Sequence, residues 1–106
     1  MGGFAIIGGS GFDAMGEIEE LGRELPETPY GTPSASVIRG RFQGRELLFL
    51  PRHGAGHKLP PHRINFRANI WALQRLGAER VLALAAVGGI GRAFGPGVLA
   101  IPDQII

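Results

Sequence analysis

All three histidines of the chain, its only lysine and two arginines fall within residues 51–63. This segment directly follows the apolar run at residues 47–50, and its glycines and prolines predict a loop at the end of a strand. Proteins of the α/β class place their binding groups at such strand ends. Arg52 offers a planar fork of donors, and His53 adds a donor whose charge can change, a combination that suits phosphate. The residues therefore predict an anion site with Arg52 and His53 as its ligands.

Two other interpretations of this segment stay open. It could be a solvated basic loop, because charged side chains are mostly exposed. It could also bind a metal ion through His53, His57 and His62, but the glycines and prolines break the helix that would align two histidines, and no carboxylate stands nearby in the sequence. We expect no metal site, and we expect His57 and His62 to support the loop and the element after it.

Composition narrows the class of protein. The 106 residues allow one domain, and a net charge of +2 is too mild to indicate nucleic-acid binding. A weaker alternative is a basic nucleic-acid-binding domain. It would be built on a hairpin that carries Arg39, Arg41 and Arg45 on one solvated face. The absence of cysteine excludes disulfides and thiolate chemistry, and no run approaches the ~20 apolar residues of a membrane span. We expect a cytoplasmic protein with neither a nucleic-acid nor a membrane partner.

The first half of the chain predicts one buried strand and a hairpin. Residues 4–7 are apolar and lead into the glycine-rich residues 8–11, which is typical of a buried strand followed by a tight loop. Residues 36–42 and 45–50 flank Gln43-Gly44, a β-hairpin signature.

The segment between the first strand and the hairpin is less regular. Residues 13–25 fit a weak helix or an irregular excursion equally well. The four turn-forming residues from Pro26 to Pro33 exclude regular structure there.

A helix and a second apolar strand follow the histidine-rich segment. Residues 63–76 carry a wide apolar arc, which predicts a helix largely buried between layers and capped by Gly77. Residues 80–87 form the next strand, and two apolar strands joined through a helix are typical of a βαβ crossover. The expected fold is α/β, a mixed and mostly parallel sheet with a flanking helix and a β-hairpin.

Glycine loops after two of these strands should meet at one edge of the sheet. Gly8 to Gly11 could present backbone N–H groups and the Ser10 hydroxyl to an anion, or simply form a tight turn. Gly88 and Gly89 also follow an apolar strand directly, and two such glycine loops at one edge of the sheet would form a single ligand crevice. Of Asn65 and Asn69, one helical turn apart, one could reach this crevice while the other bonds locally.

Residues 9–14 also match the G-x-G-x-x-G/A form of a dinucleotide fingerprint. A nucleotide-binding unit of that kind needs an acidic residue at the end of the next strand, where this chain has Arg39 and Arg41. The match is therefore weak.

Five ordered motifs, spread over nearly the whole chain, resemble those of the methylthioadenosine phosphorylases. They are residues 6–12 (IIGGSGF), 28–34 (TPYGTPS), 50–54 (LPRHG), 64–73 (INFRANIWAL) and 86–90 (AVGGI). The Val87-Gly88-Gly89 form is nearer to their bacterial methylthioinosine-cleaving relatives. Members of that family are considerably longer, and residues 98–106 read like a buried strand without polar closing residues. We therefore expect residues 1–106 to be a single, incomplete domain, the N-terminal part of the nucleoside phosphorylase fold.

The resemblance also implies roles for individual residues. Ser10, Arg52 and His53 match phosphate-binding residues, and Ala85 stands where the family often has Thr or Asn in contact with phosphate and sugar. Ala86, Val87 and Gly88 match the backbone beside purine and ribose, and Pro61 matches a residue near the sugar. No residue of this chain is implied as a catalytic acid or base, because the acidic groups that bind the departing purine belong to the carboxy-terminal half of the family.

The implied reaction is phosphorolysis of a 5′-methylthio purine nucleoside to free purine and methylthioribose 1-phosphate. It needs no metal or redox cofactor, and inorganic phosphate is the co-substrate. The resemblance also implies a homo-oligomer, a trimer or a hexamer. The alternative from another class is a phosphate- or nucleotide-binding module without catalysis.

Overall fold

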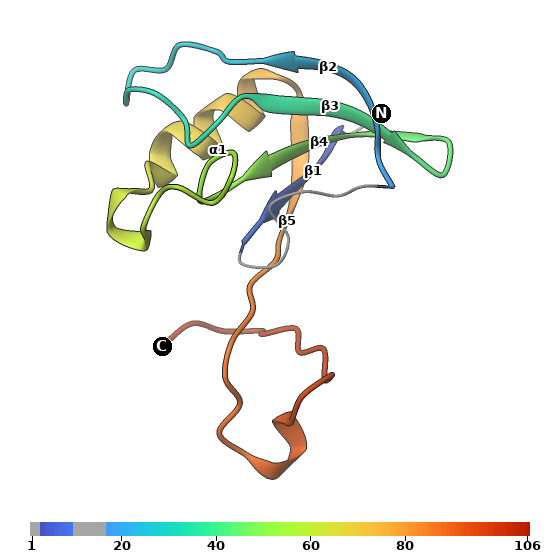
Figure 1. The fold of residues 1–106 in the computed structure, drawn as a ribbon, viewed down its shortest axis with the longest axis vertical. Helices are drawn as coiled ribbons and strands as arrows, with labels where there is room; N and C mark the ends of the chain where they lie inside the picture. Colours follow the sequence, from blue (N-terminus) through green and yellow to red (C-terminus); the bar gives the residue numbers. More distant parts are fainter. Residues whose placement is uncertain (1–2, 10–16) are drawn as a thin grey trace.

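The structure, a computed structural model, describes residues 3–9 and 17–106. Five strands of the described part form one sheet in the order β2-β3-β4-β1-β5, with helix α1 on one face (Figure 1). The elements are β1 (Gly3–Gly8), β2 (Glu19–Glu24), β3 (Val37–Phe42), β4 (Arg45–Pro51), the 3₁₀ turn η1 (Pro61–Arg63), α1 (Phe66–Arg75), β5 (Ala78–Ala83) and the 3₁₀ turn η2 (Arg92–Phe94). β1 runs parallel to β4 and β5, whereas β3 is antiparallel to β2 and β4. The expected mixed α/β sheet with a flanking helix is confirmed, with parallel and antiparallel pairings in equal number.

The predicted hairpin is confirmed in β3 and β4. Gln43 and Gly44 join the strands with φ angles of 50° and 77°. Two successive positive φ values define the type I′ turn, whose twist matches that of the flanking strands. Phe42 therefore pairs with Arg45, and this register carries through to Ile38 and Phe49.

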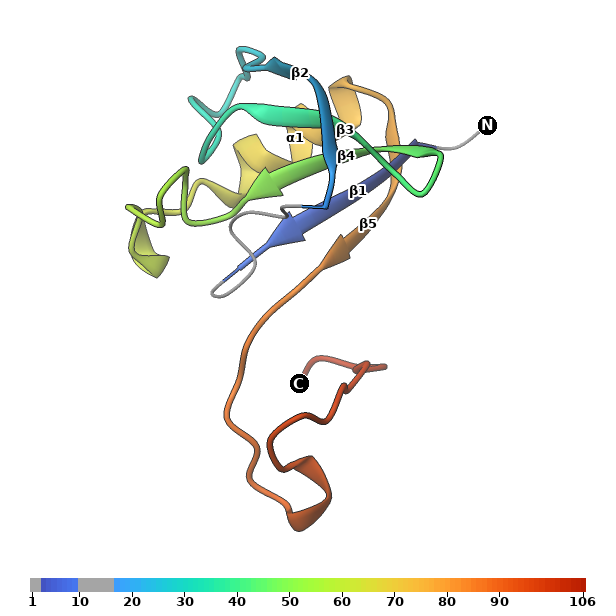
Figure 2. The ribbon, with the colours of Figure 1, turned by 45° about the vertical axis from the view of Figure 1, so that its right-hand side comes forward.

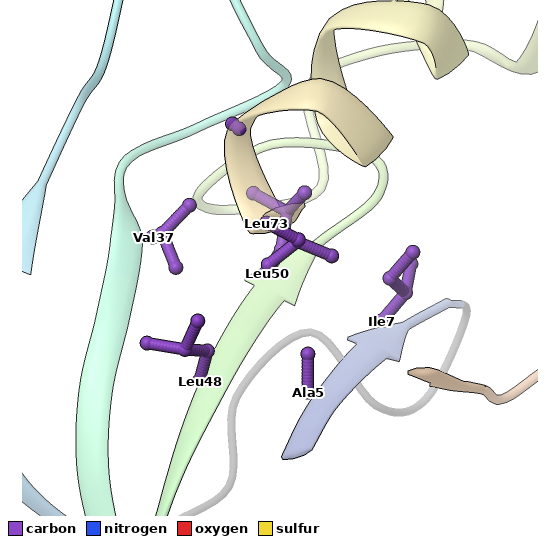
Figure 3. Packing of buried hydrophobic residues seen from close by; sticks show 7 residues of the cluster. Ala5, Ile7, Val37, Leu48, Leu50 and Leu73 are labelled. Carbon is purple, nitrogen blue, oxygen red and sulfur yellow. The ribbon is translucent and has the colours of Figure 1, made fainter. Parts of the chain in front are cut away.

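The predicted βαβ crossover is also confirmed. The chain leaves β4, passes through α1 and returns as β5, with β1 lying between the two strands. Alternate residues of the central strands face the helix, and this places Ala5, Ile7, Leu48 and Leu50 against Leu73 in the main core (Figure 3). Gly77, with φ of +100°, ends the helix as expected.

The helix is buried on one side only, which corrects the expectation that it lies between two layers. Ala68, Ala72 and Leu73 are buried against the sheet, but Phe66 is 57% and Ile70 is 52% exposed. The part of the apolar arc that carries Phe66 and Ile70 therefore faces solvent on the outer side of α1 (Figure 1).

β2 corrects the expectation for residues 13–25, which the sequence predicts as either a weak helix or an irregular excursion. The strand is formed by its antiparallel pairing with β3 and has a register shift between Glu20 and Gly22. The Arg23 side chain donates to the Glu20 carboxylate at 2.8 Å, and this hydrogen bond lowers the pKa of that exposed carboxyl. The proline-rich segment after it (residues 26–34) has no helix or strand, as predicted.

The three hairpin arginines do not form one basic face. The register places Arg39 opposite Leu48 and Arg41 opposite Glu46, whereas Arg45 is opposite Phe42 on the other face. Arg39 and Arg41 also lie 3.8 and 3.7 Å from carboxylates of β2. The arrangement gives no support to a nucleic-acid surface on this hairpin.

The last part of the chain leaves the sheet. β5 ends at Ala83, four residues earlier than predicted, and the chain beyond Leu84 extends away from the sheet before turning back (Figure 2). Residues 98–106, which resemble a buried strand in sequence, are exposed and form no strand. Within the described ranges, no helix is long and apolar enough to cross a membrane.

Candidate anion site at the carboxyl edge of the sheet

Three parallel strands end side by side at one edge of the sheet. The backbone N–H of Arg52 donates to the Gly8 carbonyl at 2.8 Å, and that of Leu84 donates to the Ile7 carbonyl at 2.9 Å. Backbone pairing thus continues one residue beyond β4 and β5. It brings Gly9, Arg52 and Leu84, which follow three different strands, to one place at the carboxyl edge, where α/β sheets bind ligands.

A tight turn presents Arg52 and His53. The Gly54 N–H donates to the Pro51 carbonyl at 3.0 Å, which closes a four-residue turn with Arg52 and His53 at its two central positions. We call residues 51–54 the Arg-His turn. Gly54 has a φ of +82°, a conformation that favours glycine, so this residue lets the chain turn directly after His53.

The Arg52 side chain lies across the three strand ends. Its Nη1 donates to the Leu84 carbonyl at 3.2 Å. A Cβ placed on Gly9 would overlap the Arg52 guanidinium, which shows that this side chain rests directly on the backbone after β1. A guanidinium has five N–H donors, and the bond to Leu84 uses one of them. The remaining donors can bind an anion, and the side chain is partly exposed to receive it.

His53 is 7% exposed and is held by its own loop. Its Nδ1 lies 2.8 Å from the Leu59 carbonyl, and the Leu59 N–H donates to the His53 carbonyl at 2.7 Å. Since a carbonyl oxygen can only accept, Nδ1 carries the hydrogen, and Nε2 of the neutral ring is an acceptor. Nε2 can therefore accept a hydrogen bond from a protonated phosphate oxygen.

The other histidines do not join a metal site. The His57 ring lies against His53, with 4.4 Å between the ring centroids, and His62 is exposed within η1. In the part of the chain that the structure describes, no three His, Cys, Asp or Glu side chains are grouped to hold a metal ion.

The remaining predicted site residues are only partly assembled. Ala85 directly follows Leu84 at the edge, and Ala86, Val87 and Gly88 lie on the exposed segment that leads away from the sheet (Figure 2). Pro61 is exposed at the start of η1. Ser10, like most of the fingerprint at residues 9–14, lies outside the described residues.

Asn65 and Asn69 behave differently from the expectation that one would reach the crevice. Asn65 Oδ1 accepts from the Ala68 N–H and caps α1, while its Nδ2 donates to the Tyr30 carbonyl at 2.7 Å. Asn69 binds Ser34. Both side chains therefore hold the proline-rich segment. Sequence reasoning could not find these contacts, because the partners are separated by 35 residues and carry no spacing signal.

A separate groove lies on the outer side of α1. It has a volume of about 500 Å³ and is lined by Tyr30, Phe66, Arg67, Ile70, Trp71 and Gln74. The Arg67 guanidinium lies 5.9 Å from the centre of the Tyr30 ring. Of the predicted anion-binding residues that the structure describes, Arg52, His53 and Ala85, none lines this groove.

A family model for the phosphorylase superfamily matches residues 4–106. The chain belongs to this superfamily. Purine nucleoside phosphorylase of Streptomyces coelicolor is 52% identical over 101 residues, and the probable S-methyl-5′-thioinosine phosphorylase of Xanthomonas campestris is 52% identical over 102 residues. S-methyl-5′-thioadenosine phosphorylase of Hyperthermus butylicus is 50% identical over 102 residues.

The chain spans well under half of the length of these relatives. The matches cover 95–96% of the present chain but only 35%, 41% and 37% of the three relatives. A solved structure of methylthioadenosine phosphorylase from Schistosoma mansoni with adenine aligns with a TM-score of 0.73 and 42% identity, over 78% of this chain and 29% of that one. The sheet and helix described above are thus part of the fold of a superfamily enzyme, as the sequence motifs predicted.

Proposed function

We propose that the full-length protein is a cytoplasmic enzyme that cleaves a 5′-methylthio purine nucleoside, methylthioadenosine or methylthioinosine, by phosphorolysis. Residues 1–106 would then be one incomplete part of its catalytic domain. The observation that carries the proposal is the Arg-His turn at the carboxyl edge of the sheet, in a chain about half identical to proteins named for this reaction.

In the proposed reaction, a phosphate oxygen bonds to the anomeric carbon of the ribose while the bond from that carbon to the purine nitrogen breaks. The purine takes up a proton as it leaves, and methylthioribose 1-phosphate is the other product. The transition state carries positive charge on the sugar. An anion held beside the anomeric carbon stabilises this charge and is also the nucleophile.

Residues of this chain would hold that anion. Arg52 supplies guanidinium donors beyond the one bound to Leu84, and His53 presents Nε2. Ser10 would add a hydroxyl from the loop after β1. Ala85 has no polar side chain, so only its main chain could take part, and Arg52 carries a larger share of the binding than it would beside a Thr or Asn.

The segment after β5 would form the nucleoside side of the site. Ala86, Val87 and Gly88 would offer backbone groups to the purine and ribose, and Pro61 would pack near the sugar. The reaction as proposed uses inorganic phosphate and no cofactor, and the protein would act as a trimer or hexamer.

The test is a purine-release assay on the purified full-length protein. Methylthioadenosine and methylthioinosine are each supplied with and without phosphate, and purine and sugar phosphate are quantified. Release of purine that requires phosphate, with an equal amount of sugar phosphate, is the expected result. Binding of phosphate and nucleoside without release of purine would instead support the non-catalytic binding module.

A further inference from the structure

We propose that Asn69 and Ser34 are positioning residues that hold the Arg-His turn in place for phosphate, an inference that rests on the function proposed above. Asn69 lies on the sheet-facing side of α1, in the middle of the helix, and is 2% exposed. Within the described residues, the side-chain hydrogen bonds of Asn69 and Ser34 join these two residues to each other and not to Arg52 or His53. They act through the backbone that lies between them and the turn.

The first step is the contact between helix and segment. The Asn69 Oδ1 accepts from the Ser34 N–H at 2.8 Å, and its Nδ2 donates to the Ser34 Oγ at 3.0 Å. Both atoms of a buried amide are thus used on a single residue of the proline-rich segment. Removing one partner would leave a buried polar group unpaired, so this contact defines the position of Ser34 strongly.

The second step is the contact between segment and turn. A Cβ built on Gly54 would lie 3.2 Å from the Ser34 carbonyl oxygen, so the backbones of the two residues are packed together. Gly54 is the closing residue of the Arg-His turn. Both ribbon views show the proline-rich segment and the loop after β4 at the same end of α1 (Figures 1 and 2). A displaced Ser34 therefore frees Gly54, and with it Arg52 and His53.

Asn65 provides a matched control on the same helix. It lies one turn before Asn69 and binds the same segment, but at Tyr30, four residues before Ser34. Its loss removes a helix cap and a side-chain bond of the same kind without touching Ser34. A purely structural role for both asparagines predicts equal effects from the two variants.

The test uses the full-length protein with the substitutions Asn69→Ala, Ser34→Ala, Ser34→Thr and Asn65→Ala. We expect Asn69→Ala and Ser34→Ala to raise the KM for phosphate about 2- to 30-fold, with a smaller change in the KM for nucleoside. Ser34→Thr keeps the hydroxyl and should restore phosphate use. Asn65→Ala should lower the melting temperature without this selective loss. Equal increases in both KM values, or the same selective loss in Asn65→Ala, would overturn the inference.

A second measurement is independent of catalysis. Hydrogen–deuterium exchange of residues 51–59 should be faster in Asn69→Ala than in wild type and Asn65→Ala, because the Gly54 and Leu59 N–H bonds belong to the loop that Ser34 holds. If wild type cleaves no nucleoside, the proposed function fails, while faster exchange still supports the positioning role. If the wild type cleaves nucleoside but exchange in Asn69→Ala equals that of the wild type, the positioning role is overturned and the proposed function is not.

Discussion

At the scale of single residues, the candidate site depends on how two neighbouring side chains are fixed. The Arg52 side chain donates to the Leu84 carbonyl, and Nδ1 of His53 lies 2.8 Å from the Leu59 carbonyl, so the protein fixes one group of each side chain. Preorganisation of this kind limits the side-chain entropy lost when an anion binds. The contributions of Arg52 and His53 to phosphate binding can therefore be tested by variants at each position.

We predict that Arg52→Ala in the full-length protein raises the KM for phosphate about 10- to 150-fold, the range expected for loss of a hydrogen bond from a charged group. The KM for nucleoside should change far less. Steady-state kinetics with each substrate varied in turn measures both. Arg45→Ala, which removes an exposed arginine from the opposite face of the hairpin, is the control and should leave both constants unchanged. Equal losses on both substrates would contradict the role given to Arg52.

His53→Asn separates the two ring nitrogens. The amide of asparagine can reproduce the Nδ1 bond to Leu59 but places nothing at Nε2. We predict that this variant is about 1 kcal/mol more stable to urea than His53→Ala, while both raise the KM for phosphate about 2- to 10-fold. A His53→Asn protein with wild-type phosphate kinetics would show that Nε2 does not contact the anion.

At the scale of elements, local signals predicted the structure wherever the cause was local. The Gln43-Gly44 turn was found because positive φ angles require particular residues, and the loop after β4 because glycine and proline mark it. β2 was missed because its pairing with β3 forms it, and no local sequence pattern reports that pairing. The position of Arg52 and His53 at a strand end could also be predicted, because the apolar run before them and the glycine after them are local signals. The support from Asn69 was not, since only the folded chain brings it to Ser34.

The end of β1 and the start of the next loop provide an element-scale prediction. Gly9→Ala would place a methyl group into the Arg52 guanidinium and within 2.8 Å of the Leu84 carbonyl oxygen. We predict a loss of about 1–3 kcal/mol in the free energy of unfolding, measured by urea denaturation, together with weaker phosphate binding by calorimetry. Gly22→Ala, on the exposed β2 with no atom within 4 Å of the new methyl, should change stability by less than about 0.5 kcal/mol. Gly9→Ala with unchanged phosphate affinity would mean that Arg52 can bind the anion from another position.

At the scale of the whole molecule, the two edges of the sheet differ. β2 carries exposed acidic and basic residues and an irregular register, features that discourage pairing with another chain. β5 at the other edge exposes Val81 and Leu82, and the segment after it exposes further large apolar side chains. The β2 edge of the sheet is therefore suited to contact with solvent, and the β5 edge to contact with further polypeptide.

This asymmetry predicts the behaviour of residues 1–106 produced alone. We expect them to bind the dye ANS and to self-associate as the concentration approaches about 100 µM, measured by fluorescence and light scattering. Leu82→Lys, which places a charge on the β5 edge, should reduce the association. The full-length protein should bind less dye per mole. A monomeric 106-residue chain without dye binding would show that these apolar groups find cover within the chain.

The position of β1 in the middle of the sheet has a consequence for the time course of synthesis. β1 is synthesised before both of its partner strands, because Ala5 pairs with Leu48 on one side and with Val81 on the other. At roughly 5–20 residues per second, its first partner follows about 2–9 seconds later and its second about 4–15 seconds later. During that interval the apolar residues of β1 are not yet covered by β4 and β5. β1 thus depends on strands that are made later to cover it, and slower translation of residues 9–78 should increase the demand for chaperones.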